Sequence, residues 1–104
     1  MTLRRWKYED ILRISELEKE YFPQEPWSYR MLADSFENEN FVGVLCEENG
    51  EIAGYGGITI GYDTADIDNI AVCESYRRCG FGGAVLEELV SAARERGSAK
   101  VFLE

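Results

Sequence analysis

The chain has 104 residues, of which 45% are hydrophobic and 30% are charged, and it carries a formal charge of −9. This length fits one small domain, and the composition is typical of a folded globular protein rather than of a disordered segment. The negative charge disfavours nucleic acid as a partner, because neutralising phosphates requires a broad basic face. It is compatible with a basic substrate, such as a lysine- or arginine-rich peptide, and equally with an acidic surface that serves solubility alone.

No apolar run is long enough to span a bilayer, and the opening sequence MTLRRWKYED lacks the apolar core of a signal peptide. We therefore expect a cytoplasmic protein with no membrane partner. The three cysteines form no C-x-x-C pair, and the chain contains no histidine, so we expect reduced cysteines and no metal site. Without histidine, a general base would have to be a carboxylate, a tyrosine, a cysteine, a lysine, the terminal amine or a water chain.

The first third of the chain predicts a short strand over residues 2–7 and then two helices. The first helix is predicted over residues 8–22 by apolar residues at helical spacing, which are Ile11, Ile14, Leu17 and Tyr21. Its charged residues are expected mostly on the solvent-facing side, namely Glu16, Glu18, Lys19 and Glu20. Pro23 ends this helix, and Ser28 is a suitable N-cap for a second one.

The middle of the chain, FVGVLCEENGEIAGYGGITI, predicts two strands joined by a tight turn at Asn49-Gly50. A third strand is predicted over residues 65–72, although its apolar residues alternate only in part. A helix over residues 82–96, ended by Gly97, and a final strand over residues 99–104 follow. The order β-α-α-β-β-β-α-β predicts a single domain over residues 1–104, an α/β (α+β) sandwich whose last helix carries a parallel connection.

The segment between the third strand of the middle region and the last helix carries an arginine- and glycine-rich pattern, R-x-x-G-x-G, followed by a further glycine. Helix N-termini with bare backbone bind phosphate well, and arginines add donors for its oxygens. The Rossmann pattern is absent because residue 85 is Val85, and the Walker pattern is absent because no lysine begins the helix. We therefore expect a phosphate site that belongs to neither of these mononucleotide-binding classes.

With this segment in place, the chain resembles the GNAT superfamily of acetyl-CoA-dependent N-acetyltransferases, whose pyrophosphate loop has the form Q/R-x-x-G-x-G/A. The similarity covers the whole chain in the family's element order, which implies a GNAT-like mixed sheet. Within the superfamily it looks most like the ribosomal-protein alanine N-acetyltransferases of the RimI type. The matching segments are Pro26-Trp27-Ser28, Asn69-Ile70-Ala71-Val72, Tyr76-Arg77-Arg78, Leu86-Glu87 and Leu103-Glu104.

This resemblance implies a set of residues for binding acetyl-CoA as the co-substrate. The pantetheine arm would hydrogen-bond, like an added strand, to the backbone of Ile70, Ala71 and Val72. The pyrophosphate would be wrapped by Arg78, Cys79, Gly80, Phe81, Gly82 and Gly83, and Arg77 holds the first position of the motif. The Cys79 thiol is expected to be incidental, because no histidine is present to activate it for acyl transfer.

Acetyl transfer to an amine requires removal of a proton from the amine and stabilisation of the thioester oxygen. In RimI-type enzymes the base is the glutamate of the Leu-Glu pair that ends the fifth strand, which corresponds here to Glu104. An exposed terminal residue without a catalytic role is the alternative for Glu104. The acceptor is expected to enter beside Trp27, for which a plug that caps the two N-terminal helices is the alternative.

The family's pattern continues past Leu-Glu with an asparagine, a helix carrying a tyrosine that acts as general acid, and two closing strands, none of which follows within the 104 residues. The expectation is therefore a GNAT domain that is C-terminally incomplete, truncated after the fifth strand, and able to form a homodimer through the open edge of that strand. Two functions remain open. The first is an N-acetyltransferase acting on a primary amine, foremost the N-terminal α-amine of a protein or peptide, with small-molecule amines as further acceptors. The second is a catalytically weak fragment that binds CoA or packs with a partner.

Overall fold

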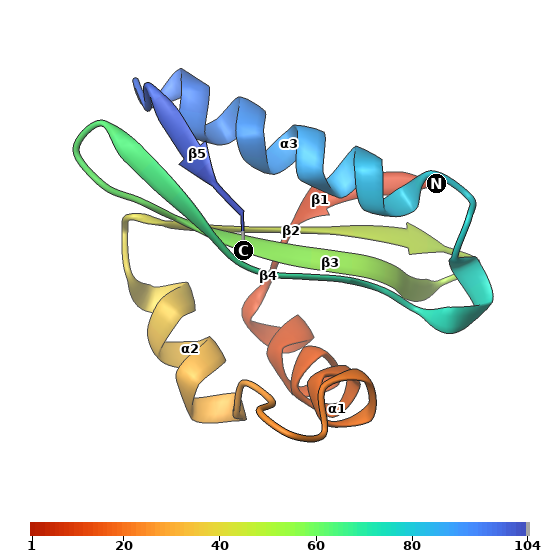
Figure 1. The fold of residues 1–104 in the computed structure, drawn as a ribbon. Helices are drawn as coiled ribbons and strands as arrows, with labels where there is room; N and C mark the ends of the chain where they lie inside the picture. Colours follow the sequence, from red (N-terminus) through yellow and green to blue (C-terminus); the bar gives the residue numbers. More distant parts are fainter. Residues whose placement is uncertain (104) are drawn as a thin grey trace.

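A single five-stranded sheet organises the fold, with helices on both of its faces (Figure 1). The computed structural model describes residues 1–103. The elements in chain order are β1 (Thr2–Arg5), a 3-10 turn η1 (Tyr8–Asp10), α1 (Ile11–Tyr21), α2 (Tyr29–Glu37), β2 (Phe41–Glu48), β3 (Glu51–Ile60), β4 (Thr64–Val72), a second 3-10 turn η2 (Glu74–Tyr76), α3 (Phe81–Glu95) and β5 (Lys100–Phe102). The predicted order and the mixed α/β class are confirmed.

The strands lie side by side in chain order, β1-β2-β3-β4-β5, and every pair is antiparallel except β4 and β5. The β2–β3 turn is the one predicted at Asn49-Gly50, where both residues have positive φ angles, 55° and 77°. Such angles suit asparagine and glycine, which fixes the register of the hairpin. The parallel connection through α3 is confirmed as well, because β4 and β5, the strands before and after this helix in the chain, pair in parallel.

One face of the sheet is covered by α1 and α2, which lie below it in Figure 1. The apolar core between them and the sheet is formed by Trp6, Ile11, Ile14, Leu17, Leu32, Phe41, Leu45, Tyr55 and Cys73. The start of α2 is fixed by its predicted N-cap, because Ser28 Oγ accepts a hydrogen bond from the Met31 N–H at 3.2 Å. This cap sets the direction in which the chain leaves the α1–α2 loop.

The opposite face is covered by α3 alone (Figure 1). Its buried stripe, Phe81, Val85, Leu89, Ala92 and Ala93, packs on apolar residues of β2, β3 and β4. The helix ends with the Ser98 N–H bonded to the Ala93 carbonyl and the Gly97 N–H bonded to the Arg94 carbonyl, both at 3.0 Å. Burying this stripe holds the N-terminus of α3 against the end of β4.

The last strand is shorter than predicted and pairs with only part of β4. It runs over Lys100–Phe102, and its partners are Thr64, Ala65 and Asp66 at the beginning of β4. Within residues 1–103, the remainder of β4 therefore has β3 on one side and no strand on the other. No helix in this described part is both long and apolar enough to cross a membrane.

Candidate functional site

A β-bulge in β4 creates the local geometry of the site. Gly57 pairs with Asn69 and the next residue, Ile58, pairs with Ile67, so Asp68 is an extra residue in β4. The bulge changes which side chains face α3: Ala65 and Ile67 do so before it, and Ile70 and Val72 do so after it. This phase change explains why the apolar residues of β4 alternate only in part, and it brings two consecutive polar residues to the opposite face.

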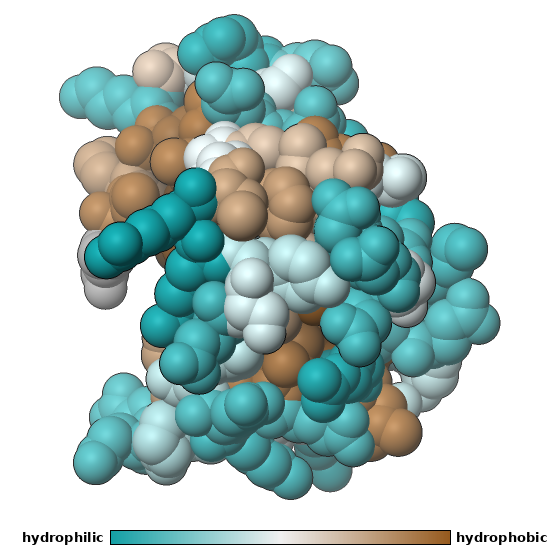
Figure 2. Space-filling model, turned by 90° about the vertical axis from the view of Figure 1, so that its right-hand side faces the viewer, coloured by the Kyte–Doolittle hydropathy of each residue, from teal (hydrophilic) through white to brown (hydrophobic). Residues whose placement is uncertain are grey.

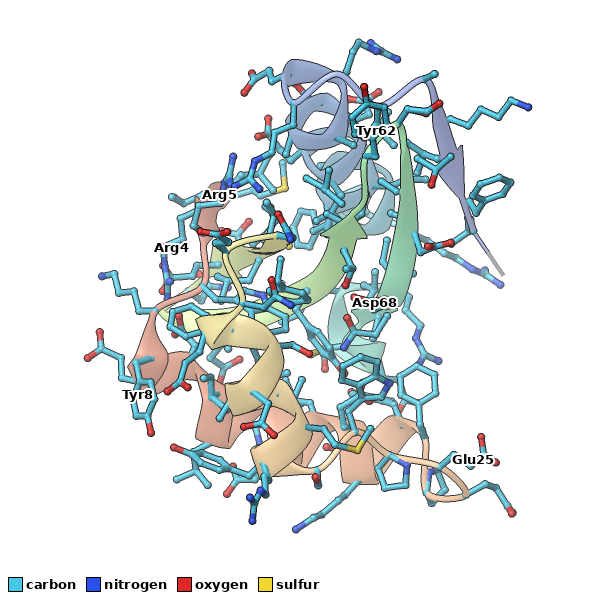
Figure 3. All side chains as sticks on the ribbon, turned by 90° about the vertical axis from the view of Figure 1, so that its left-hand side faces the viewer. Arg4, Arg5, Tyr8, Glu25, Tyr62 and Asp68 are labelled. Atoms are coloured by element: carbon cyan, nitrogen blue, oxygen red, sulfur yellow. The ribbon has the colours of Figure 1, made fainter. Side chains whose placement is uncertain are left out.

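Those polar residues line a cavity of about 260 Å³ on the side of the sheet that carries α1. The cavity is bounded by Glu18, Phe22, Glu25, Trp27, Ile67, Asp68, Asn69, Ile70 and Leu103. Asp68 lies on β4 above the α1–α2 loop that carries Glu25 (Figure 3). Helix α1, the loop that follows it, β4 and the end of the described chain therefore meet around one space.

Glu18 is a buried carboxylate at this cavity, although the sequence predicted it for the solvent side of the helix. It is 1% exposed, its Oε1 accepts from the Trp27 N–H at 3.0 Å, and its Oε2 accepts from the Tyr55 hydroxyl at 2.5 Å. Burial, and then the bond to this carboxylate, raise the pKa of Tyr55 far above its ordinary value. The available signal was spacing, because Glu18 lies four residues after Ile14 and so on the same stripe.

Trp27 is held by this arrangement at the edge of the cavity. Its backbone is bonded to Glu18, and its side chain is half-buried, packing against the α1–α2 core while also lining the cavity. Its packing against the core fits the plug, and its position at the cavity leaves entry of an acceptor beside it as a prediction.

The part of β4 beyond its contact with β5 has backbone groups that point away from the sheet. The Cys73 N–H reaches the Ala53 carbonyl on β3 at 2.8 Å, whereas the Val72 carbonyl accepts from Arg77 Nε at 3.2 Å. Because successive strand residues point their N–H and C=O groups to opposite edges, Ile70 and Val72 face outward and Ala71 faces β3. The geometry therefore favours Ile70 and Val72, rather than all three residues, for bonding to an extended ligand.

The outer edge of β4 leads to the N-terminus of α3, where the R-x-x-G-x-G segment lies. Gly80 is the N-cap with φ 81°, a left-handed conformation that glycine adopts without strain, and no side chain caps this helix. A Cβ atom placed on Gly83 would meet nothing within 4 Å, whereas one placed on Gly82 would come within 3.0 Å of Val72. The first N–H groups of α3 are thus open to a ligand, and a side chain at Gly82 would press on the Val72 side chain.

The two arginines of this segment differ in their surroundings. Arg77 is used internally, because its Nε bonds the Val72 carbonyl and its guanidinium lies 5.3 Å from the centre of the Tyr21 ring. Arg78 is exposed with φ 68°, and no hydrogen bond or ion pair of its guanidinium is found among residues 1–103. Cys79 is exposed beside it. Figure 2, which faces the end where α3 begins, shows a largely hydrophilic surface crossed by an apolar band and notched at its left edge.

The structure thus brings together most of the predicted residues along one line. The loop from Arg77 to Gly83, the outer edge of β4, and Trp27 follow one another from the start of α3 to the cavity. Glu104, the predicted base, lies outside the described residues. No cluster of Cys, Asp or Glu able to hold a metal ion occurs within residues 1–103.

Comparison with known proteins identifies the family. The model of the acetyltransferase (GNAT) family matches residues 8–104, which is nearly the whole chain. The chain therefore belongs to the GNAT acetyltransferase family, as the arginine- and glycine-rich segment and the element order predicted.

Among named relatives, the [ribosomal protein bS18]-alanine N-acetyltransferase of Escherichia coli K12 is 34% identical over 79 residues. The alignment covers 76% of this chain and 53% of that protein, so the chain spans about half the length of this relative. The protein of the same name from Haemophilus influenzae is 30% identical over 95 residues, covering 91% of this chain and 64% of the relative.

Solved structures agree with this assignment. The crystal structure of the ribosomal-protein-S18-alanine N-acetyltransferase from Escherichia coli superposes with a TM-score of 0.86 at 28% identity, covering 98% of this chain and 64% of that one. A solved structure from Agrobacterium tumefaciens reaches a TM-score of 0.87 at 20% identity and covers 100% of this chain and 81% of that one, which shows the shared fold alone.

The buried Glu18 should be essential for stability. Glu18→Ala leaves the Trp27 N–H and the Tyr55 hydroxyl without an acceptor, so we expect the free energy of unfolding to fall by about 2–4 kcal/mol in urea titrations. Glu16→Ala, on the exposed side of the same helix, is the matched control and should change it by less than about 0.5 kcal/mol. Equal effects of the two substitutions would contradict the role assigned to Glu18.

Proposed function

We propose that this protein is an acetyl-CoA-dependent N-acetyltransferase whose acceptor is a primary amine, foremost the N-terminal α-amine of a protein. The single observation that carries the proposal is the open outer edge of β4. This edge runs from a helix N-terminus that no side chain of the described residues caps to a cavity bordered by Trp27, so one end favours an anion and the other leads into a cavity. Acetyl-CoA has a matching layout: a pyrophosphate for the helix N-terminus, an extended arm for the strand edge, and a thioester for the cavity end.

The phosphate end is supported by the chemistry of the α3 N-terminus. Its N–H groups and the helix dipole favour an anion, and the Arg78 guanidinium, for which residues 1–103 provide no partner, can donate two hydrogen bonds to phosphate oxygens. Along the edge, the Ile70 backbone groups and the Val72 N–H would bond the extended arm as if it were a further strand. Arg77, which is already bonded to the Val72 carbonyl, would fix the position of that edge.

The acceptor end is supported by the cavity and by the relatives. The two named relatives acetylate the alanine terminus of a ribosomal protein according to their names, and they match this chain at 34% and 30% identity. A protein N-terminus is therefore the proposed acceptor, entering beside Trp27. The proton of the acceptor amine would pass to Glu104, the residue that corresponds to the glutamate of the family's Leu-Glu pair.

Binding of CoA can be tested without turnover. A β-branched side chain at Gly83 has room in the free protein and would occupy the space in front of the helix N-terminus, so Gly83→Val should raise the Kd for CoA at least tenfold, which is about 1.4 kcal/mol. Ser91→Val, exposed on the same helix and away from its start, is the control and should leave the Kd unchanged. Isothermal titration calorimetry measures both, and an unaltered Kd for Gly83→Val would rule out this phosphate site.

A measurement of turnover distinguishes an active enzyme from a catalytically weak fragment that binds CoA or packs with a partner. We expect acetylation of a peptide that begins with alanine, and Glu104→Gln should lower kcat by roughly 10²-fold or more while the Kd for CoA barely changes. Mass spectrometry of the peptide and calorimetry of CoA give the two quantities. Binding of CoA with no acetylated peptide in the wild type would favour the fragment, and equal rates for wild type and variant would assign the proton to another group.

A further inference from the structure

The cavity at the acceptor end has an unusual balance of charge. Its ionisable residues within the described chain are Glu18, Glu25 and Asp68, and no lysine or arginine lines it. Glu18 has both oxygens occupied, by the Trp27 N–H and the Tyr55 hydroxyl, and Glu25 is exposed on the α1–α2 loop. Asp68 is therefore the carboxylate inside the cavity that still has a free oxygen.

The carboxylate of Asp68 is held in one orientation. Its Oδ2 accepts from the Thr59 hydroxyl at 2.5 Å, and no partner for Oδ1 is found among residues 1–103. The β4 bulge presents the residue on the cavity side, two positions before Ile70, at which the proposed co-substrate edge begins (Figure 3). A cation bound to Oδ1 would thus lie beside the start of that edge.

The neighbouring Asn69 gives a second, independent indication of a ligand. Both polar atoms of its carboxamide are buried without a hydrogen-bond partner in the described chain, and the residue lines the same cavity. Buried amide groups in folded proteins are nearly always paired, so a polar group from a ligand or a water molecule is required here. A peptide group next to an amine supplies that partner.

From these observations we propose that Asp68 binds the ammonium group of the acceptor, so that the cavity selects cationic amines whose neighbouring group is a peptide. The inference rests on the proposed function, since it assigns a specificity-determining residue to the acceptor end of that site. Burial, together with the nearby Asp66 carboxylate, raises the pKa of Asp68, and a bound cation would offset this electrostatic cost. Asp68 binds and positions the amine, while proton removal stays with Glu104.

The test compares two neutralised carboxylates on the same strand. Asp68→Asn keeps the shape and an acceptor for Thr59, and Asp66→Asn is the matched control because Asp66 is exposed and does not line the cavity. The probes are a short peptide that begins with alanine and the same peptide N-acetylated. We expect the free-amine peptide to bind Asp68→Asn at least tenfold more weakly than wild type and to bind Asp66→Asn within about twofold. The acetylated peptide should bind all three proteins equally weakly.

Binding is followed by NMR titration with and without CoA, and thermal melting verifies that each variant is folded, with Asp68→Ser as the substitute if the Asn variant is not. Equal affinity of wild type and Asp68→Asn for the free-amine peptide would overturn the inference, as would equal binding of both peptides by the wild type. Acetyl transfer with an acceptor KM that is unaffected by Asp68→Asn would reject the inference and leave the proposed function standing. A wild type that neither binds CoA nor acetylates the peptide would instead reject the proposed function. Amine binding at Asp68 would still be measured by the titration without CoA.

Discussion

One extra residue in β4 is the constraint on which the site depends. Without the bulge at Asp68, the apolar residues of β4 could not face α3 both before and after this point, and no polar pair would reach the cavity. The bulge also precedes the segment of β4 that has no strand on its outer side within residues 1–103. The packing of β4 on α3 and the polar lining of the cavity therefore both follow from a single register shift, and the open edge begins just beyond it.

The open edge separates two regions of opposite chemistry. At one end, the α3 N-terminus presents free N–H groups and Arg78, which favour an anion, although the chain as a whole has a formal charge of −9. At the other end, the cavity is lined by carboxylates, and one oxygen of Asp68 has no partner within residues 1–103. A phosphate-bearing co-substrate and a cationic acceptor would thus be drawn to opposite ends of the same strand edge, which is the arrangement that transfer between them requires.

Much of the fold could be predicted from the sequence because local signals determined it: the Ser28 cap, the Asn49-Gly50 turn and the Gly97 helix end all occur where expected. The bulge could not be predicted, since the interrupted alternation of residues 65–72 indicates irregularity without saying which residue is extra. The sequence therefore does not single out Asp68. The charge of Glu18 favours the solvent side, whereas its helical spacing places it on the buried stripe. Its partners come from β3 and the α1–α2 loop, which only tertiary structure brings together.

Amide hydrogen exchange along β4 tests the central claim most directly. In the free protein the Ile70 and Val72 N–H groups should exchange rapidly at the open edge, whereas the Ala71 N–H should be protected by β3. Adding acetyl-CoA should slow exchange at Ile70 and Val72 at least tenfold and leave Ala71 nearly unchanged. Saturating acetyl-CoA with no change at Ile70 and Val72, or with equal slowing at all three residues, would contradict the account of β4 as the binding edge.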